Sequence, residues 1–236
     1  FLDKDISANF LHIFSPHPDI KTPKQASYLI DLLNTSNKSN HFLLDCNLEL
    51  KDKVSIFYLW LKTLTKFSYY ISPKENFDLK SSNINLFHIL RDNYFDTFFG
   101  PNLIYNLFTY EYIKKKIELL NNQKKSFYLY ENQGWENMIS HVIKNTTKSQ
   151  IFAVPHSTTR FWDLRHYHSA QWDVEEHPAL SNSYLVNSPY GKEHYTKNGY
   201  KESALIECEA LRYQRVSLLH KEQKEQKDKS NSLLVF

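Results

Sequence analysis

The second half of the chain alternates short apolar runs with segments of helix length, and this alternation most strongly limits how the chain can fold. The apolar runs of strand length are residues 126–130, 150–155, 183–187 and 203–209. Residues 134–144, and the residues that follow Ser188-Pro189, fit helices. Strands separated by helices of about ten residues are typical of parallel βαβ units. The pattern therefore predicts an α/β fold with a parallel sheet and flanking helices.

The helix after the third of these strands has end signals in the sequence. Ser188 belongs to the residues that cap a helix N-terminus, and Pro189 fits the first helical turn. Gly199 suits the left-handed position just after the last turn. We therefore expect a helix between Ser188 and Gly199.

The beginning of the chain is less regular. Apolar residues at helical spacing predict a helix over 22–34, and the run 41–47 is compatible with a short buried strand. Residues 53–67 are apolar on most faces, which predicts a buried helix.

Two further segments precede the alternating half. Residues 76–91 have a mixed pattern, and we expect a loop with at most short elements. Residues 96–120 predict one or two long amphipathic helices. Gly100-Pro101 marks the point where this region breaks or begins.

Size and charge exclude some classes of protein. The chain has 236 residues, of which 41% are hydrophobic, enough for one large domain or one and a half ordinary ones. Its net charge is +3 and its lysines form no single basic stripe, so no nucleic-acid partner is expected. The apolar stretches are far shorter than the ~20 residues of a membrane span, while peripheral attachment to a membrane stays open.

The cysteines and the chain ends give further expectations. Cys46 and Cys208 are isolated, which argues against a zinc knuckle and a disulfide scaffold and favours a cytoplasmic location. The chain opens on Phe1 without a signal-peptide pattern, so a piece of a longer polypeptide is expected. The predicted organisation is a first domain over 1–215, a charged linker over 216–230, and the start of a second domain over 231–236.

Polar residues stand at the carboxyl end of each predicted strand of the second half. They are Glu131, Asn132, His156, Asn187, Ser188 and Glu209. In an open parallel sheet, ligands bind in the crevice beyond the carboxyl ends of the strands. If the strands are neighbours, these side chains face the same edge and line one pocket.

Glu131 has two interpretations that stay open. A carboxylate at a strand end can be a general base or accept a hydrogen bond from a sugar hydroxyl. Alternatively, Glu131 and Asn132 cap the following helix, because acids are stabilised near a helix N-terminus. Glu136 is expected to be a surface acid that complements the helix dipole, and Trp135 is expected in the core.

His156 begins a polar stretch that also favours a site. Its ring can carry a proton or donate to phosphate, and Ser157 adds a hydroxyl. Arg160 is suited to bidentate contact with phosphate or carboxylate. The alternative is an ordinary turn in which His156 caps the next element and Arg160 pairs with a surface acid.

Several standard sites do not fit the sequence. His156, Asp163, His166 and His168 match no common zinc spacing, and no metal is expected. Ser157 lacks the elbow motif of hydrolases, and no glycine-rich nucleotide loop is present. Trp162 and Tyr167 lie near Arg160 and Arg165 and could stack on a sugar, although packing on the sheet is the commoner role of such aromatics.

The amino-acid sequence of this half resembles that of a known family. The strings "YLYENQGWE", "VPHSTTRFWDLRH", "YLVNSPYGKEHYTKNGY" and "ECEALRY" occur in this order in bacterial surface carbohydrate biosynthesis proteins, which look like two-domain GT-B glycosyltransferases. The resemblance covers about residues 90 to 215 and is strongest from 127 to 165. Residues 1–90 are not part of it.

The resemblance implies a fold and an activity. It implies a Rossmann-like N-terminal domain of a GT-B enzyme that uses a nucleotide-sugar donor, with no cofactor, in capsule or O-antigen assembly. The acceptor would be a glycan or a lipid-linked glycan, and the enzyme would act in the cytoplasm or at the inner face of the membrane. In such enzymes the N-terminal domain mostly contacts the acceptor. This chain departs from the pattern by stopping where the donor-binding domain should begin.

The recurrent strings of the family fall on defined positions here. These are Glu131, Asn132, Trp135, Glu136, Pro155, His156, Ser157, Arg160, Trp162, Asp163, Arg165, Asn187, Glu209 and Arg212. From their chemistry, Glu131 or His156 is expected to be the base, and Arg160 and Arg165 are expected to contact anionic groups. Asn132, Ser157, Asp163, Asn187 and Glu209 are expected to bind substrate. The alternatives are a nucleotide-sugar epimerase of similar architecture and a non-catalytic domain that binds glycan or partner proteins.

Overall fold

The computed structural model describes residues 8–36, 39–44, 48–70, 84–120, 122–155, 166 and 180–208. The chain divides into two compact units. The first unit comprises Phe1–Gln123 with His141–Lys148, and the second comprises Lys124–Ser140 with Ser149–Phe236. Whether residues 1–215 act as one domain stays a prediction. Within the described ranges, no helix has both the length and the apolar character needed to cross a bilayer.

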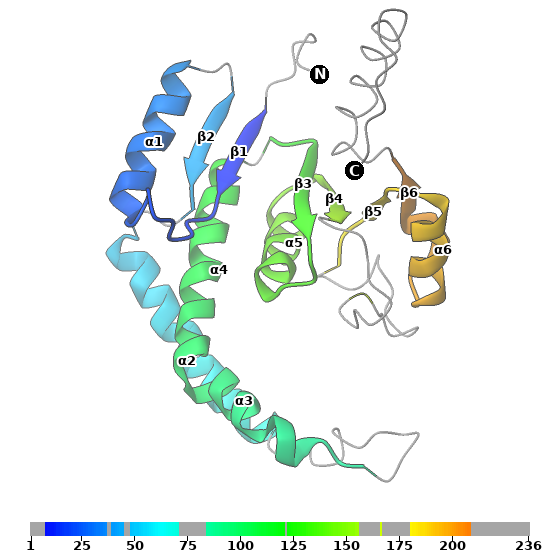
Figure 1. Cartoon of the computed structure of the whole chain (residues 1–236). Coiled ribbons are helices and arrows are strands. Elements are labelled where there is room, and N and C mark those ends of the chain that lie inside the picture. The colour runs from blue at the N-terminus through cyan, green and yellow to red at the C-terminus, as the bar shows by residue number, and fades with distance from the viewer. Residues whose placement is uncertain are drawn as a thin grey trace, which may run out of the picture. The chain divides into compact units, whose positions relative to one another are not determined.

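The first unit opens with a small parallel sheet and one helix (Figure 1). Its elements are β1 (Asn9–His12), α1 (Pro23–Ser36) and β2 (Asn40–Leu43). The helix α1 connects the two strands and packs against β2. These elements confirm the predicted helix over 22–34 and place the predicted strand at residues 40–43. Residues 45–47 of that prediction lie outside the described ranges.

Two histidines face each other across this strand pair. His12 Nε2 lies 3.0 Å from His41 Nδ1, so one ring donates a hydrogen bond to the other. The rings are stacked, and Phe10 stacks on His41 with a centroid distance of 4.9 Å. Burial lowers the pKa of His12, and the neighbouring His41 lowers it further. These surroundings therefore favour the neutral form of the His12 imidazole.

This arrangement predicts that the first unit is less stable in acid. Because the pKa of His12 is lower in the folded state, the unfolded chain binds more protons, and the contribution to stability is lost as pH falls below about 6.5. An NMR titration should place the pKa of His12 below its usual value. In His41→Phe the pKa should rise part of the way back, since only burial remains. A pKa of His12 at or above the usual value would contradict this account.

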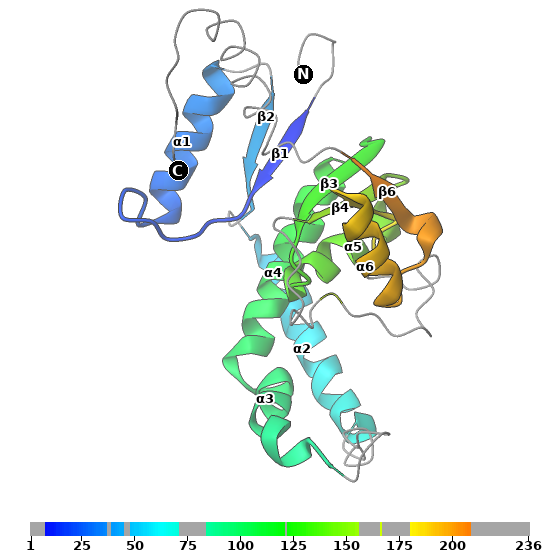
Figure 2. The same cartoon turned by 45° about the vertical axis from the view of Figure 1, so that its right-hand side comes forward.

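Three helices form most of the remaining described part of the first unit, and both views show them side by side (Figures 1 and 2). They are α2 (Leu50–Tyr70), α3 (Phe87–Phe99) and α4 (Pro101–Leu119). Gly100 separates α3 from α4, and Pro101 occupies the first turn of α4. The predicted break is confirmed. The predicted loop over 76–91 is wrong from Phe87 onward, where α3 begins, and residues 71–83 are not described.

The helix predicted over 53–67 exists as part of α2, but the prediction that it is buried is wrong. Ile56 is buried, whereas Val54, Phe57, Tyr58 and Leu61 are exposed. An apolar composition shows that a helix can be buried on several faces, and only the packing decides which faces are covered.

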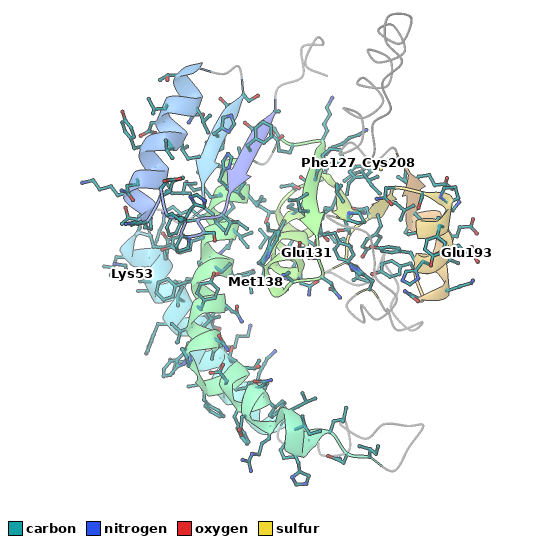
Figure 3. All side chains as sticks on the ribbon, in the orientation of Figure 1. Lys53, Phe127, Glu131, Met138, Glu193 and Cys208 are labelled. Carbon is teal, nitrogen blue, oxygen red and sulfur yellow. The ribbon has the colours of Figure 1, made fainter. Side chains whose placement is uncertain are left out.

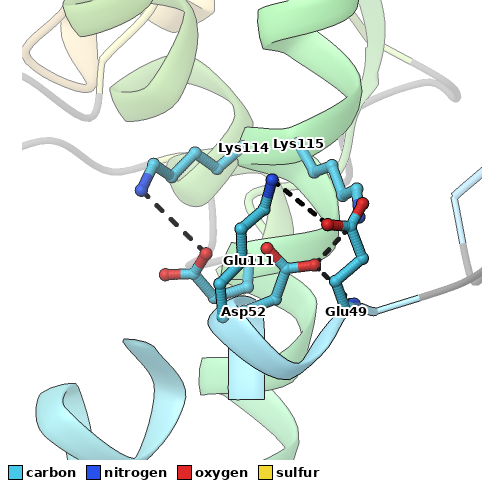
Figure 4. A network of polar contacts seen from close by, with 6 residues as sticks. Glu49, Asp52, Glu111, Lys114 and Lys115 are labelled. Carbon is cyan, nitrogen blue, oxygen red and sulfur yellow. Dashed lines mark hydrogen bonds and ion pairs between the residues drawn. The ribbon is translucent and has the colours of Figure 1, made fainter. Parts of the chain in front are cut away.

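A polar network joins α2 and the residue before it to α4 (Figure 4). The ammonium group of Lys115 donates to Asp52 Oδ2 at 2.9 Å and to Glu49 Oε1 at 3.0 Å. The Ser55 hydroxyl donates to the buried Glu111 carboxylate at 2.8 Å. These contacts fix the face that α2 turns toward α4, because breaking them would leave charged groups partly desolvated.

The second unit contains a four-stranded parallel sheet. The strands are β3 (Lys125–Tyr130), β4 (Gln150–Pro155), β5 (Ser183–Val186) and β6 (Leu205–Glu207). The elements between them are α5 (Gly134–Thr146), α6 (Pro189–Lys197) and a short turn η3 (Glu202–Ala204). The part of α5 from His141 onward is counted with the first unit. The spatial order of the strands is β3-β4-β5-β6, the same as their order in the chain. The predicted α/β class, parallel pairing and flanking helices are confirmed. The strand predicted over 203–209 begins later than expected, because residues 202–204 form η3.

The ends of α6 follow the signals in the sequence. The Ser188 hydroxyl accepts the Gly191 amide at 2.9 Å, and Gly199 has a positive φ of 92° just after the helix. The amide of Gly199 bonds to Thr196 O, and that of Tyr200 bonds to Tyr195 O. These two bonds form a Schellman motif, which brings the residues at its two ends together. Accordingly, the rings of Tyr195 and Tyr200 are 4.7 Å apart.

The two faces of the sheet differ. One face carries the buried core of the second unit, which consists of Tyr130, Ala153, Tyr184, Val186, Tyr195, Tyr200, Ala204 and Leu205. The other face presents Phe127, Leu129 and Ile206, which are exposed. Phe127 stacks on Phe152 of the neighbouring strand at 5.0 Å. Parallel sheets usually have both faces covered, whereas several apolar side chains on this face are exposed in the described part of the chain.

Candidate functional site

The carboxyl ends of β3 and β4 are level with each other. Tyr130 and Pro155 are register partners, so the chain leaves the two strands at neighbouring points, into Glu131 and into His156. Figure 3 shows Glu131 at this end of β3. The prediction that these strand ends share one edge is confirmed. His156 lies outside the described residues, so the distance between its side chain and that of Glu131 stays untested.

Glu136 holds the loop that carries Glu131. Its Oε1 accepts the Glu131 amide and its Oε2 accepts the Asn132 amide, each at 2.9 Å. Only 1% of Glu136 is exposed, and burial raises the pKa of its carboxyl despite these hydrogen bonds. The prediction of a surface acid is therefore wrong. An acid in the first turn of a helix can reach back to the amides that precede the helix, as in a capping box.

This clamp uses the backbone amide of Glu131 and not its carboxylate. Glu131 is half-buried, and its Oε2 accepts a hydrogen bond from the side-chain amide of Gln133 at 3.2 Å. Asn132 is exposed and adopts a left-handed φ of 57°, which asparagine tolerates better than most residues. The turn thus carries a carboxylate and an amide on consecutive residues, and both kinds of group can form hydrogen bonds with hydroxyl groups.

Trp135, in the first turn of α5, packs against β3. It is half-buried and meets the Tyr128 ring edge-on at 6.3 Å. The predicted core position is thus confirmed only in part.

The end of β5 contributes Asn187 to the same edge. Asn187 is exposed, and its Oδ1 lies close to the backbone of Gly191 in α6. A Cβ atom added to that glycine would be 3.7 Å from the Oδ1. Ser188 is occupied as the cap of α6, and its carbonyl accepts the Lys192 amide. Ser188 therefore serves the start of α6, and Asn187 is an exposed polar side chain at this strand end.

The other predicted site residues lie outside the described ranges. They are His156, Ser157, Arg160, Asp163, Arg165 and Glu209. Their roles stay predictions. Of the predicted set, the structure therefore brings Glu131, Asn132 and Asn187 to one edge of one sheet.

Beneath this edge, on the covered face, lies a cluster of aromatic hydroxyl groups. The Tyr130 and Tyr200 hydroxyls are 2.7 Å apart, and the Tyr128 hydroxyl lies 2.8 Å from Ser181 Oγ. Burial raises the pKa of Tyr128 to about 12 and raises the pKa of Tyr130 further. These tyrosines are therefore protonated at neutral pH and act as hydrogen-bonding supports.

His166 belongs to this buried cluster. It is 5% exposed, packs edge-on against Tyr130 and lies 3.4 Å from the Tyr195 hydroxyl through Nδ1. The described ranges contain no group of three or more residues that could hold a metal ion. The other possible metal ligands in the sequence, His156, Asp163 and His168, lie outside the described ranges.

Comparisons with known proteins give no relative for this chain. No model of a protein family, no curated protein and no solved structure matches it.

Proposed function

We propose that this chain is the acceptor-side domain of a GT-B-like glycosyltransferase that builds a bacterial surface polysaccharide from a nucleotide-sugar donor. The observation that carries the proposal is the shared edge where Glu131, Asn132 and Asn187 follow parallel strands. This is where open α/β sheets bind their ligands. The resemblance of residues 90 to 215 to surface carbohydrate biosynthesis proteins supplies the reaction class.

The electrostatics near β3 support an acceptor over a phosphate at this position. Glu131 and Glu136 place two carboxyl groups at the start of α5, and Glu136 occupies two of the amides that an anion would need. A diphosphate here would meet negative charge, whereas a sugar hydroxyl could donate to Glu131. Phosphate contacts would then come from Arg160 and Arg165 or from a second domain.

In the proposed mechanism Glu131 or His156 removes the proton from the acceptor hydroxyl. The hydroxyl oxygen then attacks the anomeric carbon of the donor, and the nucleotide leaves with the bonding electron pair. The arginines stabilise the charge that develops on the leaving phosphate. Asn132 and Asn187 orient the acceptor by hydrogen bonds.

The test is an assay of the full-length protein against a panel of nucleotide-activated sugars with glycan and lipid-linked acceptors. Transfer from one donor to an acceptor is the expected result. Interconversion of a nucleotide-sugar without transfer would support an epimerase instead. Saturable glycan binding with neither reaction would favour the non-catalytic alternative and overturn the proposal.

A further inference from the structure

The helix α2 has an exposed apolar stripe on the side away from its α4 contacts. We call this set the outer stripe; it consists of Leu50, Val54, Phe57, Tyr58 and Leu61, whose exposed fractions run from 42% to 79%. Their spacing of three, four and seven residues places them along one side of a helix. Ile56 on the opposite side is buried, and Asp52 and Ser55 bond to α4. The helix is therefore apolar on two sides, and α4 covers one of them.

Lysines flank the outer stripe. By helical periodicity Lys53 lies on one flank and Lys51 and Lys62 lie on the other, and all three are exposed. Figure 3 shows Lys53 on the outside of α2. Lys51 pairs with Glu49 at 3.2 Å, but no acidic residue of the described ranges forms an ion pair with Lys53 or Lys62.

The acidic residue of α2 does not offset this positive charge. Asp52 is the acid present in α2, its side chain is 12% exposed, and it bonds to Lys115 on α4. The outward side of α2 is therefore apolar along its centre and basic along its margins. This distribution is typical of helices that lie in the interface of an anionic bilayer.

We propose that α2 docks on the surface of an anionic membrane through the outer stripe, with its lysines on the lipid headgroups. Apolar burial and attraction between lysines and anionic lipids would act together. A second copy of the chain fits this surface less well, because pairing two such faces would bring lysines close to lysines. The inference stands on α2 alone and does not depend on the proposed transfer reaction.

The experiment is co-sedimentation of the whole chain with vesicles of phosphatidylcholine alone or with added phosphatidylglycerol. Two variants test the surface: Phe57→Ser with Leu61→Ser, and Lys53→Glu with Lys62→Glu. Two matched controls change exposed residues of α1 and the residues before it: Tyr28→Ser with Leu32→Ser, and Lys21→Glu with Lys24→Glu. Circular dichroism checks that each variant retains its helices.

We expect the wild-type chain to bind only the vesicles that contain phosphatidylglycerol, and less as salt is raised. Each α2 variant should weaken binding by at least about tenfold, whereas the α1 controls should bind as the wild type does. Two results would overturn the proposal. One is equal vesicle binding by all variants. The other is no vesicle binding by the wild-type chain, together with a dimer that becomes a monomer in the double variant Phe57→Ser with Leu61→Ser.

Discussion

Glu131→Gln is expected to lower the rate of glycosyl transfer by about 10²- to 10⁴-fold, the usual contribution of a general base. The amide keeps the size of the side chain and its contact with Gln133, but it cannot accept the acceptor's proton at neutral pH. The loop should stay in place, because Glu136 holds the amides of Glu131 and Asn132 independently of the Glu131 side chain. The measurement is kcat for the full-length protein with the donor that the panel identifies.

His156→Ala in the same assay decides which residue is the base. If His156 is the base, its variant should show the large loss and Glu131→Gln a smaller one. Glu193→Gln serves as the matched control for Glu131, since Glu193 is an exposed acid on α6 whose ion pair is with Lys197. Normal transfer by both Glu131→Gln and His156→Ala, with the fold intact, would show that the assigned site is wrong.

Glu136→Ala is expected to destabilise the turn after β3 by about 2 kcal/mol, because two partly buried amides lose their acceptor. The amides of Glu131 and Asn132 should then exchange with solvent faster than in the wild type, as measured by NMR hydrogen exchange. Glu193→Ala, at an exposed position of the same unit, should change stability by no more than about 0.5 kcal/mol. Unchanged exchange of the two amides in Glu136→Ala would contradict the clamp.

Glu136→Gln separates the charge of this residue from its hydrogen bonds. Because the folded pKa of Glu136 is raised, the folded state binds the proton more tightly than the unfolded chain does. Its contribution to stability should therefore increase as pH falls from neutral toward the ordinary glutamate pKa of about 4.3. Glu136→Gln should lack this pH-dependent contribution to stability. Urea unfolding of both proteins at several pH values measures the difference.

The elements of the second unit were predictable because their signals are local. Alternating apolar runs and the caps at Ser188 and Gly199 specify strands and a helix without knowledge of the remote chain. The position of Glu131 followed from a general rule about parallel sheets. This rule needs only the order of the strands, which proved to be that of the chain.

The predictions that were wrong or missing concern packing between residues that are distant in the sequence. The exposure of Phe57 could not be read from α2, since an apolar helix does not reveal which of its sides has a partner. Glu136 was missed although its first-turn position was a usable signal, because the same position also suits a surface acid. His166 is buried because it packs against Tyr130 of β3 and Tyr195 of α6, two elements that are distant in the sequence.

The sequential strand order has a consequence for how the second unit forms. Each strand pairs with the one that precedes it in the chain, so β4 can add to β3, β5 to β4, and β6 to β5 as each segment leaves the ribosome. No strand has to wait for a later one to be inserted between it and its neighbour. The loops that must close are short relative to the chain, which favours rapid assembly for a parallel sheet. Strand β3, which leads into Glu131, is thus formed first, and the later strands add to the sheet one after another.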